Sequence, residues 1–256
     1  MRLLLMLLLL TWNQAQGEDW PQFLGPSRTG VYAGAAPQSV SAAIWKIDVG
    51  QGFSGPVVAR GRVILFHRRE NRASVESLDA ATGKRVWISE YPTDYRDDFG
   101  FDEGPRATPA IAGEGIYTFG AEGVLQSLDF ATGKRIWSVD TRQKFGADKG
   151  FFGAVCSPLV ENGRVLMNVG GPKGAGIVAF DAPTGKTLWT ATNDEAGYSA
   201  PVATTINGAR HALFFTRAGL VDIDPESGKI RFQFPWRSRS HASVNAAAPV
   251  VAGNLV

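Results

Sequence analysis

The sequence SLDAATGKRVW at residues 77–87 recurs three more times along the chain, and this repeat decides the fold. The later copies are SLDFATGKRIW at 127–137, AFDAPTGKTLW at 179–189 and, more divergent, DIDPESGKIRF at 222–232. The aspartates of successive copies lie 50, 52 and 43 residues apart, at Asp79, Asp129, Asp181 and Asp224. Self-similarity at a period of this size is typical of propellers, solenoids and repeat arrays. The repeat therefore predicts a series of similar structural units.

Each copy predicts a tight turn between two strands. An aspartate side chain accepts hydrogen bonds from nearby backbone, and a glycine adopts the positive φ that such a turn requires. The aromatic residue that ends each copy begins the returning strand, where a large flat side chain gains most by burial between packed sheets. Besides the four aspartates, the predicted structural residues are Gly83, Gly133, Gly185, Gly228, Trp87, Trp137, Trp189 and Phe232.

A second marker follows the same period. Pro56, Pro109, Pro158, Pro201 and Pro249 each precede a short apolar run. Proline is tolerated at the first residue of a strand but not inside it, so each unit contains four short strands, the first of which follows the proline. Four antiparallel strands per repeat describe one blade of an all-β propeller. We expect complete blades at 56–91, 109–139, 158–191 and 201–234, and the start of a fifth blade at 249.

The N-terminal residues 1–17 have the composition of a secretory signal peptide. Arg2 precedes an apolar run at 3–10, and the small residues Ala15 and Gly17 precede the expected cleavage point. The run is too short to span a bilayer, and no cysteine that could carry a lipid anchor lies near the cleavage point. We expect an exported protein, periplasmic or extracellular, without a transmembrane segment or a lipid anchor.

The segment that follows the signal peptide is predicted to precede a partial propeller. Residues 18–43 are rich in proline, glycine and serine and are expected to form an irregular arm. Residues 44–49 alternate like a strand and are expected to be a lone strand that closes the ring, which makes 44–256 the propeller domain. An open ring leaves strand edges unpaired, so the sequence indicates a fragment of a longer protein. Completion of the ring by another chain and a strained four-bladed closure are the alternatives.

Composition narrows the class of partner. The net charge of +2 is too small to indicate a nucleic-acid partner. The single cysteine, Cys156, cannot form an internal disulfide and is expected to be a small buried side chain. The three histidines, His67, His211 and His241, occur in separate units without metal-ligand spacing, so no metal site is assigned.

Binding residues are expected on one face of the propeller. The links between consecutive blades are the longest connections, and they emerge on the face that we call the loop face; the TGK turns lie on the opposite, turn face. Long loops on a rigid scaffold usually carry function. The candidates for ligand or cofactor binding are Arg106, Thr108, Ser157, Asn168, Gly170, Gly171, Tyr198, Ser199 and Asn245. Hydrogen bonding to strand ends is the alternative role of the polar ones, and no catalytic residue is assigned.

The LDAATGK-x-x-W repeats resemble the pyrroloquinoline-quinone-like (PQQ-like) β-propeller repeat, which quinoprotein alcohol dehydrogenases share with the outer-membrane-protein assembly lipoprotein of Gram-negative bacteria. The stretches DWPQFLGPSRTG, GPRATPAI, SPLVENGRVL and GYSAPV look like those of the exported branch that is abundant in planctomycetes. The dehydrogenase resemblance implies PQQ with calcium as cofactor. That family also carries adjacent cysteines joined in a disulfide ring, whereas this chain has only Cys156.

Three functional hypotheses follow. The first is an exported, non-catalytic scaffold that binds a protein or a small-molecule or saccharide ligand through its loop face. The second is the N-terminal part of a PQQ-dependent alcohol or sugar dehydrogenase. The third is a scaffold similar to the outer-membrane assembly factor.

Overall fold

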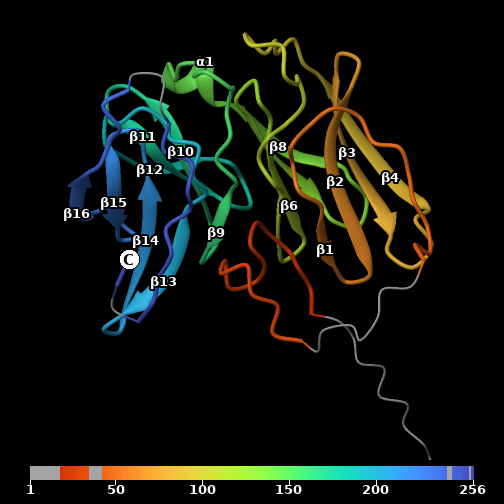
Figure 1. The fold of residues 1–256 in the computed structure, drawn as a ribbon, viewed down its shortest axis with the longest axis horizontal. Helices are drawn as coiled ribbons and strands as arrows, with labels where there is room; N and C mark the ends of the chain where they lie inside the picture. Colours follow the sequence, from red (N-terminus) through yellow and green to blue (C-terminus); the bar gives the residue numbers. More distant parts are fainter. Residues whose placement is uncertain (1–17, 35–41, 241–243, 254) are drawn as a thin grey trace, which may run out of the picture.

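The computed structural model describes residues 18–34, 42–240, 244–253 and 255–256 (Figure 1). The predicted signal peptide at 1–17 lies outside the described residues, as do residues 35–41 of the predicted arm and His241. Within the described ranges there are sixteen strands and one short helix, α1 (Thr141–Phe145). None of the described segments forms a helix long and apolar enough to cross a membrane.

The strands form four antiparallel sheets, each built from four consecutive strands. The first blade contains β1 (Val57–Ala59), β2 (Arg62–Arg69), β3 (Arg72–Asp79) and β4 (Arg85–Pro92). The second contains β5 (Ala110–Ala112), β6 (Gly115–Phe119), β7 (Val124–Asp129) and β8 (Arg135–Asp140). The third contains β9 (Leu159–Glu161), β10 (Arg164–Gly171), β11 (Ala175–Asp181) and β12 (Thr187–Ala191). The fourth contains β13 (Val202–Ile206), β14 (Ala209–Phe215), β15 (Gly219–Ile223) and β16 (Ile230–Pro235).

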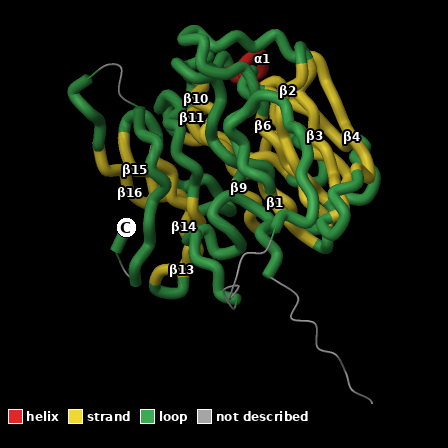
Figure 2. Tube along the Cα trace, turned by 45° about the vertical axis from the view of Figure 1, so that its right-hand side comes forward, coloured by secondary structure: helices red, strands yellow, loops and turns green. Residues whose placement is uncertain are grey.

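This architecture confirms the predicted all-β fold of four-stranded blades. The first strands β1, β5, β9 and β13 contact one another in that order, so the blades lie side by side with their first strands innermost (Figures 1 and 2). Helix α1 and the long links between blades gather at the top of the view in Figure 1. Hydrophobic clusters fill the spaces between successive blades.

The repeated turn has the predicted geometry. In the first blade the carboxylate of Asp79 accepts from the backbone N–H of Thr82 at 2.8 Å and from its hydroxyl at 2.7 Å. Gly83 has a φ of 68°, and its N–H donates to the carbonyl of Asp79 at 2.8 Å. These hydrogen bonds lower the pKa of Asp79, chiefly through the Thr82 hydroxyl. The turn therefore depends on a short polar side chain and on a residue that tolerates positive φ.

The aromatic residue of each copy packs on the turn of the following blade. A Cβ atom added to Gly185 would lie 2.6 Å from the ring of Trp137, so only glycine leaves room for the indole. The Nε1 of Trp137 donates to the carbonyl of Ala182 at 2.8 Å, and that of Trp87 donates to the carbonyl of Phe130 at 3.1 Å. The repeat thus encodes the joint between two blades as well as the turn within one blade.

The structure corrects the predicted strand at 44–49. This segment contains no strand, and main-chain pairing with a described strand occurs only after it, at the isolated bridge between Gln51 and Arg68 of β2. Its Trp45 nevertheless packs on the first turn: a Cβ atom on Gly83 would lie 2.7 Å from the Trp45 ring, and the indole donates to the carbonyl of Ala80 at 2.9 Å. Trp45 therefore contacts the first blade as Trp87 contacts the second.

The two ends of the blade series differ from its middle. Phe232 holds the same repeat position as Trp137 but is 44% exposed, whereas Trp137 is 9% exposed. All residues of β16 are exposed, since no described blade packs against that strand. In the predicted fifth blade, Ala252 and Leu255 form an isolated antiparallel bridge, and no longer strand is present in the described part of this segment.

The N-terminal arm, described from residue 18 to 34, contacts all four blades. Trp20 forms an isolated antiparallel bridge with Val58 of the first blade, and the carbonyl of Pro21 accepts from the N–H of Ile111 at 2.8 Å. The guanidinium of Arg28 donates to the carbonyl of Pro158 at 2.6 Å and to that of Pro201 at 2.8 Å. Burial lowers the pKa of Arg28 to about 10, so the side chain stays charged at neutral pH.

The packing predicts unequal effects for two substitutions at the same repeat position. Trp137→Ala should lower the free energy of unfolding by about 3–5 kcal/mol, because it empties a buried site between two blades. Phe232→Ala should cost less than about 1 kcal/mol, because this ring has lost most of that burial. Urea denaturation of both variants measures the difference, and equal losses would contradict the repeat-joint interpretation.

The arm yields a second prediction. Arg28→Ala should lower the free energy of unfolding by about 3 kcal/mol, because it leaves buried carbonyl oxygens in two blades without their charged donor. Arg135→Ala, at an exposed position of β8, is the matched control and should stay within about 0.5 kcal/mol of the parent protein. If both variants unfold like the parent, the arm does not link the blades.

The buried thiol of Cys156 yields a third prediction. Burial raises its pKa to about 11 from an ordinary value of 9.0, which corresponds to about a hundredfold less thiolate at neutral pH. Since the thiolate is the reactive form, the native protein should react with a disulfide reagent at least about a hundredfold more slowly than the urea-unfolded chain. Equal rates in the two states would show that Cys156 is accessible.

Candidate functional site

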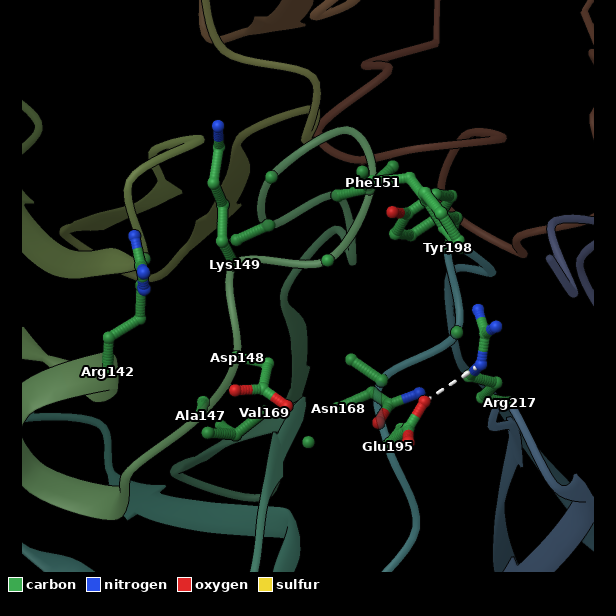
Figure 3. Close-up of a pocket in the computed structure, with 18 of the residues that line it drawn as sticks. Arg142, Ala147, Asp148, Lys149, Phe151, Asn168, Val169, Glu195, Tyr198 and Arg217 are labelled. Atoms are coloured by element: carbon green, nitrogen blue, oxygen red, sulfur yellow. Dashed lines mark ion pairs between the residues drawn. The ribbon is translucent and has the colours of Figure 1, made fainter. Parts of the chain in front are cut away.

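A cavity of about 420 Å³ opens on the loop face over the second, third and fourth blades. Its walls come from three successive links between blades and from the ends of β6 and β10, and Figure 3 shows the side chains that line it. The buried side chains of Phe119 and Val169, together with Val155, give the cavity an apolar portion. A concave site that combines apolar surface with a few ionic groups is the usual form of a ligand pocket.

Most of the ionic side chains of this cavity are paired. The ammonium of Lys149 contacts a carboxylate oxygen of Asp98 at 2.5 Å. Arg217 contacts Glu195 at 2.8 Å, an ion pair drawn in Figure 3, and its guanidinium lies 5.3 Å from the centre of the Phe151 ring.

The lining also includes one guanidinium, that of Arg142, and one carboxylate, that of Asp148. Within the described part of the chain, neither side chain takes part in a hydrogen bond or an ion pair, and both residues are exposed. Figure 3 shows Arg142 on one wall and Asp148 between it and Asn168. The cavity therefore presents one guanidinium and one carboxylate that have no hydrogen-bond or ion-pair partner among the described residues.

Three of the predicted binding residues line the cavity: Asn168, Gly170 and Tyr198. The phenol oxygen of Tyr198 accepts from the N–H of Phe152 at 2.9 Å, and burial raises the pKa of Tyr198. In the amide orientation that satisfies both groups, Asn168 donates to the carbonyl of Gly176 at 3.2 Å and accepts from the N–H of Gly197 at 3.1 Å. These side chains fix the loops that form the walls.

Five other predicted residues are buried outside the cavity lining. The hydroxyl of Thr108 accepts from the N–H of Gly55 at 3.2 Å, and that of Ser157 accepts from the N–H of Thr108 at 3.0 Å. Ser199 donates to the carbonyl of Ala200 at 3.2 Å. The amide of Asn245 donates to the carbonyls of Thr216 and Trp236 at 2.8 and 2.9 Å, and Gly171 lies against Phe145. The polar ones bond the backbone at strand ends, and their role in ligand binding stays a prediction.

Arg106 is enclosed within the link between the first two blades. Its guanidinium contacts Asp97 at 3.0 Å and donates to the carbonyls of Gly104 and Asp102 at 2.6 and 2.7 Å. The side chains of Arg106 and Asp97 are 6% and 0% exposed. Burial acts to raise the pKa of Asp97, but the N–H of Phe101 and the Arg106 guanidinium together hold it below its ordinary value. In this structure Arg106 thus orders a loop and does not line the cavity.

Sequence reasoning did not predict the aromatic cluster at the edge of the cavity, whose residues Phe99 and Phe151 also line it. Phe99 and Phe101 from one link meet Phe151 and Phe152 from the next, with ring centres 5.2–6.4 Å apart. Phe99 is 52% exposed and Phe101 is 71% exposed. The signal was present as FGF at 99–101 and FF at 151–152, within two long links. We call these four residues the aromatic rim.

The residues of the cavity do not fit a calcium-bound quinone. The described residues contain no group of three acidic, histidine or cysteine side chains that could hold a metal ion. Two of the three cationic side chains in the lining are neutralised by carboxylates, and Arg106 is committed to Asp97. The lining therefore lacks the set of available arginine forks that a multiply carboxylated quinone requires.

Comparison with known proteins identifies the family. A family model described as outer membrane protein assembly factor BamB matches residues 71–256. The chain is 27% identical over 198 residues to the outer membrane protein assembly factor BamB of Burkholderia pseudomallei (strain K96243), and the match covers 75% of this chain and 45% of that protein. The chain thus spans less than half the length of this curated relative.

Two solved structures are similar in fold. The structure of BamB from Moraxella catarrhalis matches with a TM-score of 0.50 and 20% identity, over 78% of this chain and 54% of that chain. The quinohemoprotein alcohol dehydrogenase ADHIIG from Pseudomonas putida HK5 matches with a TM-score of 0.50 and 19% identity, over 71% of this chain and 34% of that chain. At such identities the likeness concerns the fold alone. From the family match and the four blades, we conclude that the chain belongs to the BamB family of PQQ-like β-propeller repeat proteins.

Proposed function

We propose that this protein is an exported, non-catalytic scaffold that resembles the outer-membrane assembly factors and holds a protein partner on its loop face. The observation that carries the proposal is the aromatic rim, which exposes Phe99 and Phe101 at 52% and 71% beside an open cavity. Exposed apolar patches on a soluble surface commonly mark interaction sites, and aromatic residues are enriched among the residues that dominate binding energy.

The loop that carries the rim is held in place by buried ionic groups. Arg68 is 2% exposed, and its guanidinium donates to the carbonyls of Tyr95 and Glu103 at 2.7 and 3.0 Å. Arg106 anchors the same loop through Asp97, whose carboxylate also accepts from the N–H of Phe101 at 2.8 Å. A surface that is already ordered before binding loses less conformational entropy when the partner docks.

The family match supports this function over an enzymatic one. The family model and the curated relative both carry the name of an outer-membrane-protein assembly factor. A PQQ-dependent dehydrogenase has the support of fold likeness only, and the paired charges of the cavity do not favour it. We therefore infer a protein as the principal partner.

Export belongs to the same proposal. The signal-peptide pattern at 1–17, the arm at 18–43 and the propeller at 44–256 describe a protein that acts in the periplasm or outside the cell. The stretch DWPQFLGPSRTG and its companions support membership of the exported planctomycete-type branch. In this organisation the loop face is the surface that binds the partner.

The proposal predicts where a partner can be captured in cells. A photo-crosslinking amino acid placed at Phe101 should link the protein to a component of the outer-membrane assembly machinery, identified by mass spectrometry. The same amino acid at Lys134, in a TGK turn on the turn face, is the control and should give no such product. The double substitution Phe99→Ser and Phe101→Ser should weaken binding of the purified partner by about tenfold or more.

Two outcomes would overturn the proposal. One is equal crosslinking from Phe101 and Lys134, because contact would then be unrelated to the loop face. The other is the absence of any envelope protein among the products at Phe101 while circular dichroism shows that the variant is folded.

A further inference from the structure

We propose that the loop-face cavity binds a small zwitterion with an apolar body, an apolar amino acid or a short apolar peptide. In this arrangement the carboxylate of the ligand pairs with Arg142, its ammonium pairs with Asp148, and its side chain lies on the apolar portion of the cavity. The shared chemistry is one positive charge, one negative charge and a hydrocarbon group in a single molecule.

The first argument for this ligand is the set of charges in the cavity lining. Of six ionic side chains, four form two internal pairs, Lys149 with Asp98 and Arg217 with Glu195. The remaining two, Arg142 and Asp148, have opposite signs, and their side chains form no hydrogen bond or ion pair within the described ranges. A ligand of one sign would satisfy one of them and partly desolvate the other, which costs free energy. A ligand that carries both signs satisfies both.

The second argument is the apolar portion of the cavity. Phe119 and Val169 are 2% and 5% exposed, and Val155 extends the same surface. A volume of about 420 Å³ lies within the range of small-molecule sites. Burial of a hydrocarbon side chain there removes apolar surface from water and favours binding, a gain that a compact polyol does not obtain.

The third argument is that internal hydrogen bonds and close packing hold the cavity walls in place before any ligand binds. Asn168 connects β11 to the link that contains Gly197, as described above, and Tyr198 fixes the neighbouring link through Phe152. Gly170 has a φ of 76° and lies against Ala196, so a larger residue there would displace the wall. Fixed walls keep the shape of the cavity before binding, which limits the conformational entropy that ligand binding costs.

This inference can be tested separately from the protein-partner proposal, although Phe99 and Phe151 of the aromatic rim also line the cavity. Phe101, the most exposed residue of the aromatic rim, does not line the cavity. Phe101→Ser should therefore weaken partner binding and leave binding of the zwitterion unchanged.

The test is calorimetric titration of the full chain with matched ligands. L-leucine and leucyl-leucine carry both charges and separate the amino-acid source from the peptide source. N-acetyl-leucine lacks the ammonium, leucinamide lacks the carboxylate, and maltose is an uncharged polyol. We expect saturable binding of at least one zwitterion, and binding about tenfold weaker or more for each analogue that lacks one charge.

Two substitutions test which cavity residue pairs with each charge of the ligand. Asp148→Asn keeps the side-chain shape, and Arg142→Gln replaces the guanidinium by a shorter uncharged amide; each should weaken binding of the zwitterion by about tenfold to a hundredfold. Arg142→Gln should also abolish the preference for leucine over leucinamide, which a general loss of folding would not do. The control is Lys144→Gln, since Lys144 lies on the same helix but contacts Thr187 at 2.9 Å outside the cavity, and binding should be unchanged.

Three results of these titrations would contradict the proposal. No heat from either zwitterion at about 10 mM would overturn the proposal, because a site with two charge-assisted contacts should saturate below that concentration. Unchanged binding in both charge variants, or binding of maltose alone, would also overturn it; the latter result would indicate a saccharide site.

Discussion

The structure depends on one contact, the packing of an indole on the turn glycine of a blade, which in three of its occurrences comes from the fourth strand of the preceding blade. It occurs four times, between Trp45 and Gly83, Trp87 and Gly133, Trp137 and Gly185, and Trp189 and Gly228. The glycine is required twice over, since its φ is positive and the indole occupies the place of a side chain. Because the contact joins neighbouring blades at the same position along each blade, the links between blades all lie on the same face, the loop face.

That constraint explains why the two faces differ. The repeated turns use their polar side chains internally, as Asp79 does with Thr82, and the arm residue Asp19 accepts from the N–H of Arg60 in the first turn between strands. The links on the loop face are free to vary in length, and two of them carry the aromatic rim and most of the cavity lining. The scaffold is thus repetitive where blades join and varied on the loop face.

The sequence predicted the parts of the fold that repeat. Prolines and TGK turns placed all four blades, because proline, glycine and tryptophan have strong local requirements that recur at each period. It did not predict that residues 44–49 lack strand structure, since pairing depends on a neighbouring strand and not on the segment itself. It also did not predict the enclosure of Arg106 by Asp97, because that contact depends on a loop conformation that no spacing rule encodes. Asn168, Gly170 and Tyr198 could be predicted because their distance in sequence from a strand end sets how far along the blade they lie. The contact between Phe99 and Phe152 could not be predicted in this way, because it joins two irregular links.

Hydrogen exchange of the tryptophan indoles, measured by NMR, tests the central claim most directly. If the indole contact joins the blades, the Nε1 protons of Trp87 and Trp137, which donate to carbonyls of the next blade, should exchange only through opening of the joint. The indole of Trp236, 60% exposed, provides the fast reference in the same spectrum. Strong protection of the first two relative to Trp236 is the expected result. Exchange of all three at one fast rate would show that these indoles do not hold the blades together.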